Sequence, residues 1–471
     1  MKRTATVALS AGLTFALAAG YVVCDCCDVL PGVLSFASSD LQSMTIDTYK
    51  PVSGQSFISS SRSDPVDSRS AARLLDDFAA NSAVGSDWSA VIMSEEGQVA
   101  ASREPGTKRE PASVLKMITA AAAARGLDMS STLKTQVCLD NSNSKDPVSH
   151  LVLKGGGDVL LSGGENDFSH VNGRAGLKTL AKNTAEALKK SGISKVTAGY
   201  DDSLFGTDRA PARLSESNED RLYAMEQSSM AIDIGRNRSE SGSLANPDGL
   251  AYVRRSASPA TDAARKFFSL LSEEGIEVSG IVSEEKTASS SVVATAESAK
   301  LYEILDFTLK TSDNTLAEEF GRLLALKTNH SNSSQGAVEA VCDTLKNAGI
   351  DISDLEMSDC SGLSPGSRLT ASILAQTEKI CLNRGAAAVA AVEGTAVSGL
   401  SGTALEHSVA EDAAGLIRLK TGTLPSVNSM TGFVSRKNGS NLIFAIIVNN
   451  PSDSNGAKNA IDAFVSKLPS L

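Results

Sequence analysis

The two ends of this sequence differ from its middle, and that contrast constrains the fold more than any other feature. Near the C-terminus, three strand-like runs (414–423, 427–439 and 440–450) are separated only by turn residues, and a helical run at 458–468 follows them. Near the start, residues 88–105 alternate apolar and polar side chains about a Glu-Glu-Gly turn, which predicts a hairpin. We expect the two ends to close one sheet and helices to cover it.

The middle of the chain divides into a helical part and inserted material. Residues 136–289 combine short strands, Gly-rich turns and two helical runs, and we predict that they form one or more inserted domains. The segments 71–135 and 290–471 would then make up the main domain. The predicted fold class is α/β, of the α+β kind, with an antiparallel sheet covered by helices.

The first residues predict an export element. Lys2 and Arg3 precede a largely apolar, uncharged stretch at 5–23, and Ala-Leu-Ala at 16–18 offers a small-residue cleavage site, so residues 1–25 are typical of a signal peptide. The same stretch approaches the roughly 20 residues that cross a bilayer as a helix, so a membrane anchor is the alternative. Residues 26–70, rich in Ser, Asp and Thr, predict a flexible linker. We expect the body of the protein to work outside the cytoplasm.

The net charge and the cysteines limit the binding partners, metal sites and disulfide bonds that the chain can have. The formal charge of -11 and the lack of a Lys/Arg cluster argue against nucleic acid as a partner. Three cysteines lie beside the apolar stretch in a CDCC cluster without the spacing of a zinc site. In an oxidising compartment the four others could pair in any of three ways, and these four are Cys138, Cys342, Cys360 and Cys381.

The helix-forming run at 110–127 carries a candidate nucleophile at its head. Ser113 and Lys116 stand three positions apart, a spacing that puts both side chains on one face of a helix. A lysine can activate a serine if its amine is neutral, and burial beside other cations disfavours the charged form. The first helical turn also favours developing negative charge.

A histidine-based hydrolase is the competing interpretation. The chain has four histidines and one GxSxG string, at 362–366. In a nucleophile elbow the residue after the serine donates its backbone N–H to the oxyanion, and Pro365 has none. The string is therefore excluded as a nucleophile elbow.

Two further motifs strengthen the case for Ser113. Four SxxK strings occur, and each alone is as compatible with a helix cap and a solvated lysine, but only Ser113 opens a long apolar helix. Downstream, Ser312-Asp313-Asn314 precedes an amphipathic helix, and Lys420-Thr421-Gly422-Thr423 lies in the first C-terminal strand. Alone, these read as a helix cap and a strand-end lysine, whereas the three motifs in this order indicate an acyl-transfer site.

The motifs SVLK, SDN and KTGT resemble those of the penicillin-recognising serine enzymes. The large gap between the first two motifs is similar to that of the class C low-molecular-mass penicillin-binding proteins, the D-alanyl-D-alanine carboxypeptidases/endopeptidases. The resemblance covers about residues 70–471, and further stretches that match it are LVLKGGGD (151–158), YDDSLFG (200–206), SMAIDIGRNR (229–238), FFSLLSEEGIEVSG (267–280), SDCSGLSPGSRLT (358–370) and KTGTLPSVNSMTGFV (420–434). It implies that the main domain, 71–135 and 290–471, is a transpeptidase-like catalytic domain of the penicillin-binding-protein/β-lactamase type.

The resemblance also implies roles for individual residues. Ser113 would be the nucleophile, Lys116 its base and Ser312 a proton relay to the leaving amine. Peptidoglycan stem peptides would be the substrates, β-lactam antibiotics would acylate Ser113, and no metal or organic cofactor would be needed. The residues expected to bind substrate are Asn314, Lys420, Thr421, Gly422, Thr423, Asp158 and Arg368.

Some positions depart from the family pattern. Cys360 stands where the family usually has glycine, and Pro365 where it often has an arginine that binds a stem-peptide carboxylate. Arg368 is a candidate substitute for that arginine, and Asp158 could face a substrate ammonium or merely cap a turn. A β-lactamase or esterase on the same scaffold, and a wall-binding protein without activity, are the alternatives to a DD-peptidase.

Overall fold

The structure, a computed structural model, describes Tyr21 and residues 65–140, 148–237, 247–249, 252–287, 290–382, 389–437 and 439–471. The predicted export element at 1–25 lies outside these residues apart from Tyr21, as do the CDCC cluster and most of the predicted linker. Among the described helices, none combines the length and apolar character that a membrane span requires. Residues 62–471 belong to one compact unit.

One antiparallel sheet joins the two ends of the chain, as the sequence predicts. The hairpin of β1 (Trp88–Ser94) and β2 (Val99–Arg103) adds to the C-terminal meander through pairing of β1 with β13. The strand order is β10-β11-β12-β13-β1-β2, and the remaining strands are β10 (Ala396–Val397), β11 (Ile417–Leu424), β12 (Val427–Val434) and β13 (Leu442–Asn449).

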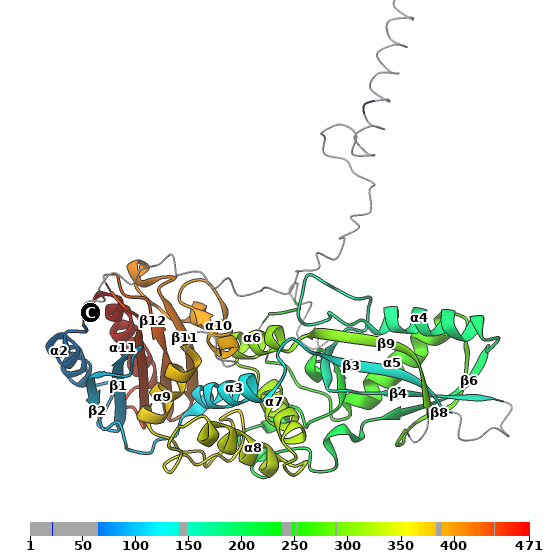
Figure 1. Ribbon diagram of the computed structural model, residues 1–471, viewed down its shortest axis with the longest axis horizontal. Coiled ribbons are helices and arrows are strands. Elements are labelled where there is room, and N and C mark those ends of the chain that lie inside the picture. The colour runs from blue at the N-terminus through cyan, green and yellow to red at the C-terminus, as the bar shows by residue number, and fades with distance from the viewer. Residues whose placement is uncertain are drawn as a thin grey trace, which may run out of the picture. The chain divides into compact units, whose positions relative to one another are not determined.

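Helices cover both faces of this sheet, so its central strands are apolar on both sides. In β13, Phe444 and Ile446 pack with the face covered by α2 (Ser68–Ala79) and α11 (Ser454–Lys467), while Ile443 and Ile447 belong to the cluster on the other face. Figure 1 shows α2 and α11 on one side of the sheet and α9 on the other. The alternation explains why all eight residues of β13 are buried.

Helix α3 (Leu115–Gly126) runs through the middle of the catalytic domain (Figure 1). Its run of five alanines favours a helix, and every residue from 115 to 124 is buried. Such a helix has no solvent face and needs neighbours all round. They are α6 (Leu301–Thr311), α7 (Asn314–Lys327), α8 (Ser334–Asn347), α9 (Ala371–Leu382) and α10 (Val389–Glu393).

The inserted region forms a second, five-stranded sheet in the order β8-β6-β4-β3-β9. Helices α4 (Leu177–Lys190) and α5 (Pro259–Glu273) pack together and share its apolar core. The strands are β3 (Thr132–Asp140), β4 (Ser149–Lys154), β6 (Lys195–Asp201), β8 (Glu277–Glu284) and β9 (Ser290–Lys300), with a separate pair β5 (Asp158–Leu161) and β7 (Met230–Ile232). The second sheet thus extends beyond 136–289 at both ends, because β3 and β9 pair with each other where the chain leaves and re-enters the catalytic domain.

The four cysteines of the body, Cys138, Cys342, Cys360 and Cys381, all carry free thiols in the structure. The pairing that an oxidising compartment would permit is therefore absent among them. Burial raises the pKa of the Cys360 and Cys381 thiols well above the ordinary value, which keeps them protonated.

Candidate active site

Ser113 lies in a single 3-10 turn, Ala112–Val114, that leads directly into α3. The turn is held against the sheet, since the Ser429 hydroxyl of β12 donates to the carbonyl of Pro111 at 2.6 Å. Ala112 has a φ of 53°, which is unfavourable for a residue with a β-carbon. Strain of this kind beside a candidate nucleophile is characteristic of functional sites.

The Lys116 amine has three partners, and their arrangement suits a base. Its Nζ lies 2.9 Å from Ser113 Oγ, 2.7 Å from Asn314 Oδ1 and 2.8 Å from the carbonyl of Ser361. The last two are acceptors towards Nζ, so they engage the two N–H bonds that a neutral amine keeps. The lone pair is then left for the hydroxyl of Ser113.

Burial favours the neutral amine. The Lys116 side chain is 1% exposed, and burial lowers its pKa to about 8 against the opposing charges of Asp359, Asp313 and Glu318. The Lys420 side chain is also completely buried, and burial together with the charge of Lys116 holds its pKa well below the ordinary value. The charge of Lys116 thus disfavours the charged form of its buried neighbour Lys420.

The SDN and KTG motifs complete the site. Ser312 lies between α6 and α7 with a φ of 56°, and its Oγ accepts a hydrogen bond from Lys420 Nζ at 2.9 Å. Asn314 bonds Lys116 through Oδ1 and donates through Nδ2 to the carbonyl of Tyr223 at 3.1 Å. The structure therefore brings together Ser113, Lys116, Ser312, Asn314 and Lys420, which the sequence predicts to share one site.

Gly422 permits β11 to approach the nucleophile. A β-carbon at this position would lie 3.0 Å from the backbone nitrogen of Ser113 and 2.4 Å from Ser429 Oγ. Only a residue without a side chain allows this contact. The Gly422 backbone, one residue before Thr423, thus passes close to the backbone nitrogen of Ser113.

A pocket of about 670 Å³ opens over these groups. It is lined by Ser113, Glu216, Ser217, Tyr223, Tyr252, Ser312, Asn314, Gly362, Leu363, Thr403, Glu406, His407, Thr421, Thr423, Leu424, Pro425, Ser454 and Lys458. We call this the catalytic pocket. Lys116 and Lys420 do not line it, but their amines are hydrogen-bonded to Ser113 and Ser312, which do.

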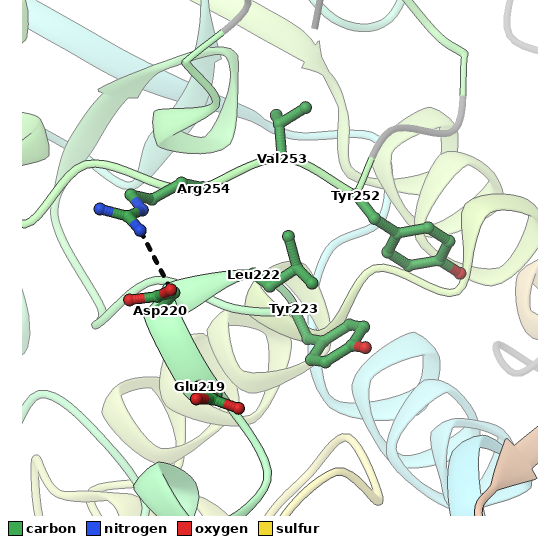
Figure 2. A pocket seen from close by; sticks show the side chains of 7 residues that line it. All are labelled: Glu219, Asp220, Leu222, Tyr223, Tyr252, Val253 and Arg254. Atoms are coloured by element: carbon green, nitrogen blue, oxygen red, sulfur yellow. Dashed lines mark ion pairs between the residues drawn. The ribbon is translucent and has the colours of Figure 1, made fainter. Parts of the chain in front are cut away.

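Two tyrosines separate the catalytic pocket from a neighbouring hollow. Tyr223 and Tyr252 line both, and their rings meet edge to face with centroids 5.8 Å apart. Figure 2 shows both rings on one side of this hollow, with the Arg254–Asp220 ion pair on the other. The aromatic pair therefore forms one rim of the catalytic pocket.

Comparison with known families agrees with this geometry. The model of the D-Ala-D-Ala carboxypeptidase 3 (S13) family matches residues 71–247 and 239–468, which is most of the chain. The chain belongs to this family. Membership makes it a serine-type D-Ala-D-Ala carboxypeptidase, and the resemblance inferred from the three motifs is confirmed.

Individual relatives of this S13 carboxypeptidase agree. A carboxypeptidase of Mycobacterium tuberculosis is 32% identical over 76% of this chain and 74% of the relative. A D-alanyl-D-alanine carboxypeptidase of Actinomadura sp. (strain R39) is 27% identical over 77% of each. The crystal structure of penicillin binding protein 4 from Haemophilus influenzae has a TM-score of 0.67 and 19% identity, covering 84% of this chain and 98% of that one, and it confirms the predicted fold.

Two of the predicted substrate-binding residues of this S13 carboxypeptidase lie elsewhere. Asp158 is 1% exposed, its Oδ1 accepts from the N–H of Leu160 at 2.9 Å, and burial raises its pKa to about 7. Arg368 lies 3.6 Å from Glu110 and donates to the carbonyl of Ser367. Neither residue lines the catalytic pocket, and a role for them in substrate binding stays a prediction. The turn-capping role for Asp158 is the one the structure supports.

The departure at Cys360 is accommodated without strain. Cys360 is not among the described residues with positive φ, and its thiol fills the space left by Gly321, where a β-carbon would lie 2.4 Å from Sγ. Its backbone joins two helices, because its N–H donates to Glu318 of α7 and its carbonyl accepts from Thr119 of α3. At Pro365, the nearby cation is Arg213, whose guanidinium lies 3.5 Å from the Pro365 carbonyl and pairs with Glu216.

Several residues of the site were not predicted from the sequence of this carboxypeptidase. Asp359 accepts from the Ser361 hydroxyl and from three successive backbone N–H groups, of Gly362, Leu363 and Ser364, and so shapes the loop whose carbonyl binds Lys116. This loop belongs to a stretch the sequence singles out, SDCSGLS, but nothing local assigns the role. Thr403 and His407 line the catalytic pocket from a segment with no motif at all.

Proposed function

We propose that this carboxypeptidase is an exported DD-peptidase that cleaves stem peptides of peptidoglycan through an acyl-enzyme on Ser113. The observation that carries the proposal is the Lys116 amine, fixed by Asn314 and Ser361 so that its free lone pair meets Ser113 Oγ. Ser113 attacks the carbonyl of the penultimate D-alanine, and Lys116 takes the proton. The backbone N–H groups of Ser113 and Thr423 then stabilise the oxyanion.

The remaining steps use the second and third motifs. Ser312, hydrogen-bonded to Lys420, relays to the leaving D-alanine amine the proton that Lys116 took from Ser113, and Asn314 holds the donor backbone. Lys420 and Thr421 receive the terminal carboxylate. Water releases the acyl group, and the same steps on a peptide cross-link give endopeptidase activity. β-Lactams acylate Ser113 because their carbonyl and carboxylate mimic the dipeptide, and the Haemophilus influenzae penicillin binding protein 4 has been crystallised with a β-lactam.

A labelling experiment tests the acyl-enzyme. Fluorescent penicillin modifies the wild type and leaves Ser113→Ala unlabelled, while Ser364→Ala, which alters the serine of the excluded GxSxG string, keeps the label. Equal labelling of wild type and Ser113→Ala would refute the assignment. Rapid turnover of the penicillin with little release of D-alanine from peptide would instead point to a β-lactamase.

Two further experiments test the finer claims. Incubation with defined muropeptide monomers and cross-linked dimers, followed by mass spectrometry, gives the ratio of terminal trimming to cross-link cleavage. Cell fractionation tests export and membrane association, since an exported protein appears outside the cytoplasmic fraction. Recovery of the full-length chain only in the cytoplasm would contradict the export proposal.

A further inference from the structure

The catalytic pocket is lined beside the KTG motif by hydroxyls and not by the Lys420 amine. Lys420 is completely buried, and its Nζ donates to Ser312 Oγ at 2.9 Å and to the Thr421 carbonyl at 2.7 Å. Thr421 and Thr403 do line the pocket, each 7% exposed, and their hydroxyl oxygens are hydrogen-bonded at 3.0 Å. A ligand that reaches this wall therefore meets two adjacent hydroxyls first.

We propose that Thr403 is a second hydroxyl donor, beside Thr421, in the subsite for the terminal carboxylate of the substrate. This inference rests on the proposed function, which brings a D-alanine carboxylate to this wall. A carboxylate has two oxygens that each accept hydrogen bonds. In the free enzyme one hydroxyl donates to the other, and when the carboxylate arrives both O–H groups turn to it and form charge-assisted bonds.

The electrostatics of the site make a second hydroxyl useful. Burial and the charge of Lys116 hold the pKa of Lys420 well below its ordinary value. The amine behind the wall therefore supplies less positive charge than an exposed lysine would. Because a buried carboxylate needs partners for its lone pairs, neutral donors at the wall carry more of its binding.

The turn that carries Thr403 is fixed at both ends, so its hydroxyl is held in position. It is the 3-10 turn Gly402–Glu406, and a β-carbon on Gly402, whose φ is 57°, would lie 2.6 Å from the Lys310 carbonyl of α6. At the other end Lys458 donates to the carbonyl of Glu406 at 2.6 Å, and His407 Nδ1 lies 2.5 Å from the buried Asp462 of α11. A hydroxyl held this way loses little freedom when it binds substrate.

Three variants separate a hydroxyl donor from a packing role. Thr403→Val keeps the shape and loses the hydroxyl, whereas Thr403→Ser keeps the hydroxyl. Thr377→Val is the matched control, because Thr377 is also buried and the substitution removes a hydroxyl bond to the Ile373 carbonyl within α9, away from the pocket. Release of the leaving group is measured for two peptides: D-alanine from a peptide ending in D-Ala-D-Ala, and D-alaninamide from the same peptide with its terminal carboxylate amidated.

We expect Thr403→Val to lower kcat/KM for the acid peptide about 10- to 100-fold, as for the loss of one hydrogen bond to a charged group. Thr403→Ser and Thr377→Val stay within about threefold of wild type. The amide peptide, which has no carboxylate, shows a much smaller change with Thr403→Val.

Three results would overturn the inference: Thr403→Val as active as wild type on the acid peptide, Thr403→Ser impaired as much as Thr403→Val, or equal losses on the acid and amide peptides. A wild type that releases no D-alanine from the acid peptide is a different outcome, because it overturns the proposed function and this inference with it.

Discussion

At the scale of single residues, the surroundings of Lys116 decide whether Ser113 can react. A lysine in water is protonated at neutral pH, so its ammonium group cannot accept a proton. In this structure burial lowers the pKa of Lys116 to about 8, while Asp359, Asp313 and Glu318 oppose the shift. Desolvation lowers the pKa of Lys116 and the three carboxyl groups raise it, and the resulting pKa lies slightly above neutral pH.

This balance predicts the pH dependence of the enzyme. Only the neutral amine accepts the Ser113 proton, so kcat/KM for D-alanine release should rise with pH through about 8 and then level off. At pH 7 about one-tenth of the amine is neutral. The profile is measured from about pH 6 to about pH 10, with circular dichroism over the same range to exclude unfolding. A flat or falling profile through pH 8 would show that Lys116 is not the base.

At the scale of elements, α7 and the SDCSGLS loop fit each other through one small residue. Gly321 of α7 leaves room for the Cys360 thiol, and a β-carbon there would also lie 3.2 Å from Ala337 Cβ of α8. The same loop presents the Ser361 carbonyl to Lys116. The departure of the sequence from the family glycine is thus matched by space in a neighbouring helix.

Gly321→Ala should therefore destabilise the protein by about 1–3 kcal/mol through overpacking. Adding Cys360→Ala removes the sulfur that the new methyl meets, so the double variant should recover part of this loss, with a coupling energy of about 1 kcal/mol. Urea unfolding of the two single variants and the double variant measures the coupling. Gly106→Ala is the control, since its added methyl meets no atom within 4 Å. Additive effects in the cycle would contradict the direct contact.

At the scale of the whole molecule, the inserted region supports the SDN motif. Arg255 donates to Asp313 at 2.8 Å, and both side chains are buried. Although burial opposes ionisation of Asp313, the charge of Arg255 and a hydrogen bond from the Leu316 N–H lower its pKa. Gln227 reaches the carbonyl of Thr315, which follows the motif directly. The start of α7 is thus held by residues that come from outside the catalytic domain.

Arg255→Leu should cost about 3–5 kcal/mol of unfolding free energy, because it leaves a buried carboxylate without its partner. Since Asp313 lies between Ser312 and Asn314, labelling by fluorescent penicillin should slow as well. Arg254→Ala is the matched control, since its ion pair with Asp220 is half exposed and should contribute about 1 kcal/mol or less. Equal effects of the two substitutions, in urea unfolding and in labelling rate, would contradict this role for the inserted region.

Features that depend on residues close together in the sequence could be predicted from the sequence alone. The spacing of Ser113 and Lys116 puts both on one helical face, and strand-like runs separated by turn residues predict the hairpin and the C-terminal meander. The three motifs, far apart in the chain, were predicted to meet because their residue types perform one reaction together.

Which side chains are buried, and which residues distant in sequence contact one another, could be seen only in the tertiary structure. In the tertiary structure Asp158 is buried and Arg368 pairs with Glu110, although Asp158 and Arg368 are both chemically able to bind a peptide. The tertiary structure also brought Thr403 against Thr421 from a segment without any recognisable pattern. Periodicity shows which face of an element is apolar, whereas desolvation and hydrogen bonding depend on which other elements pack against that face.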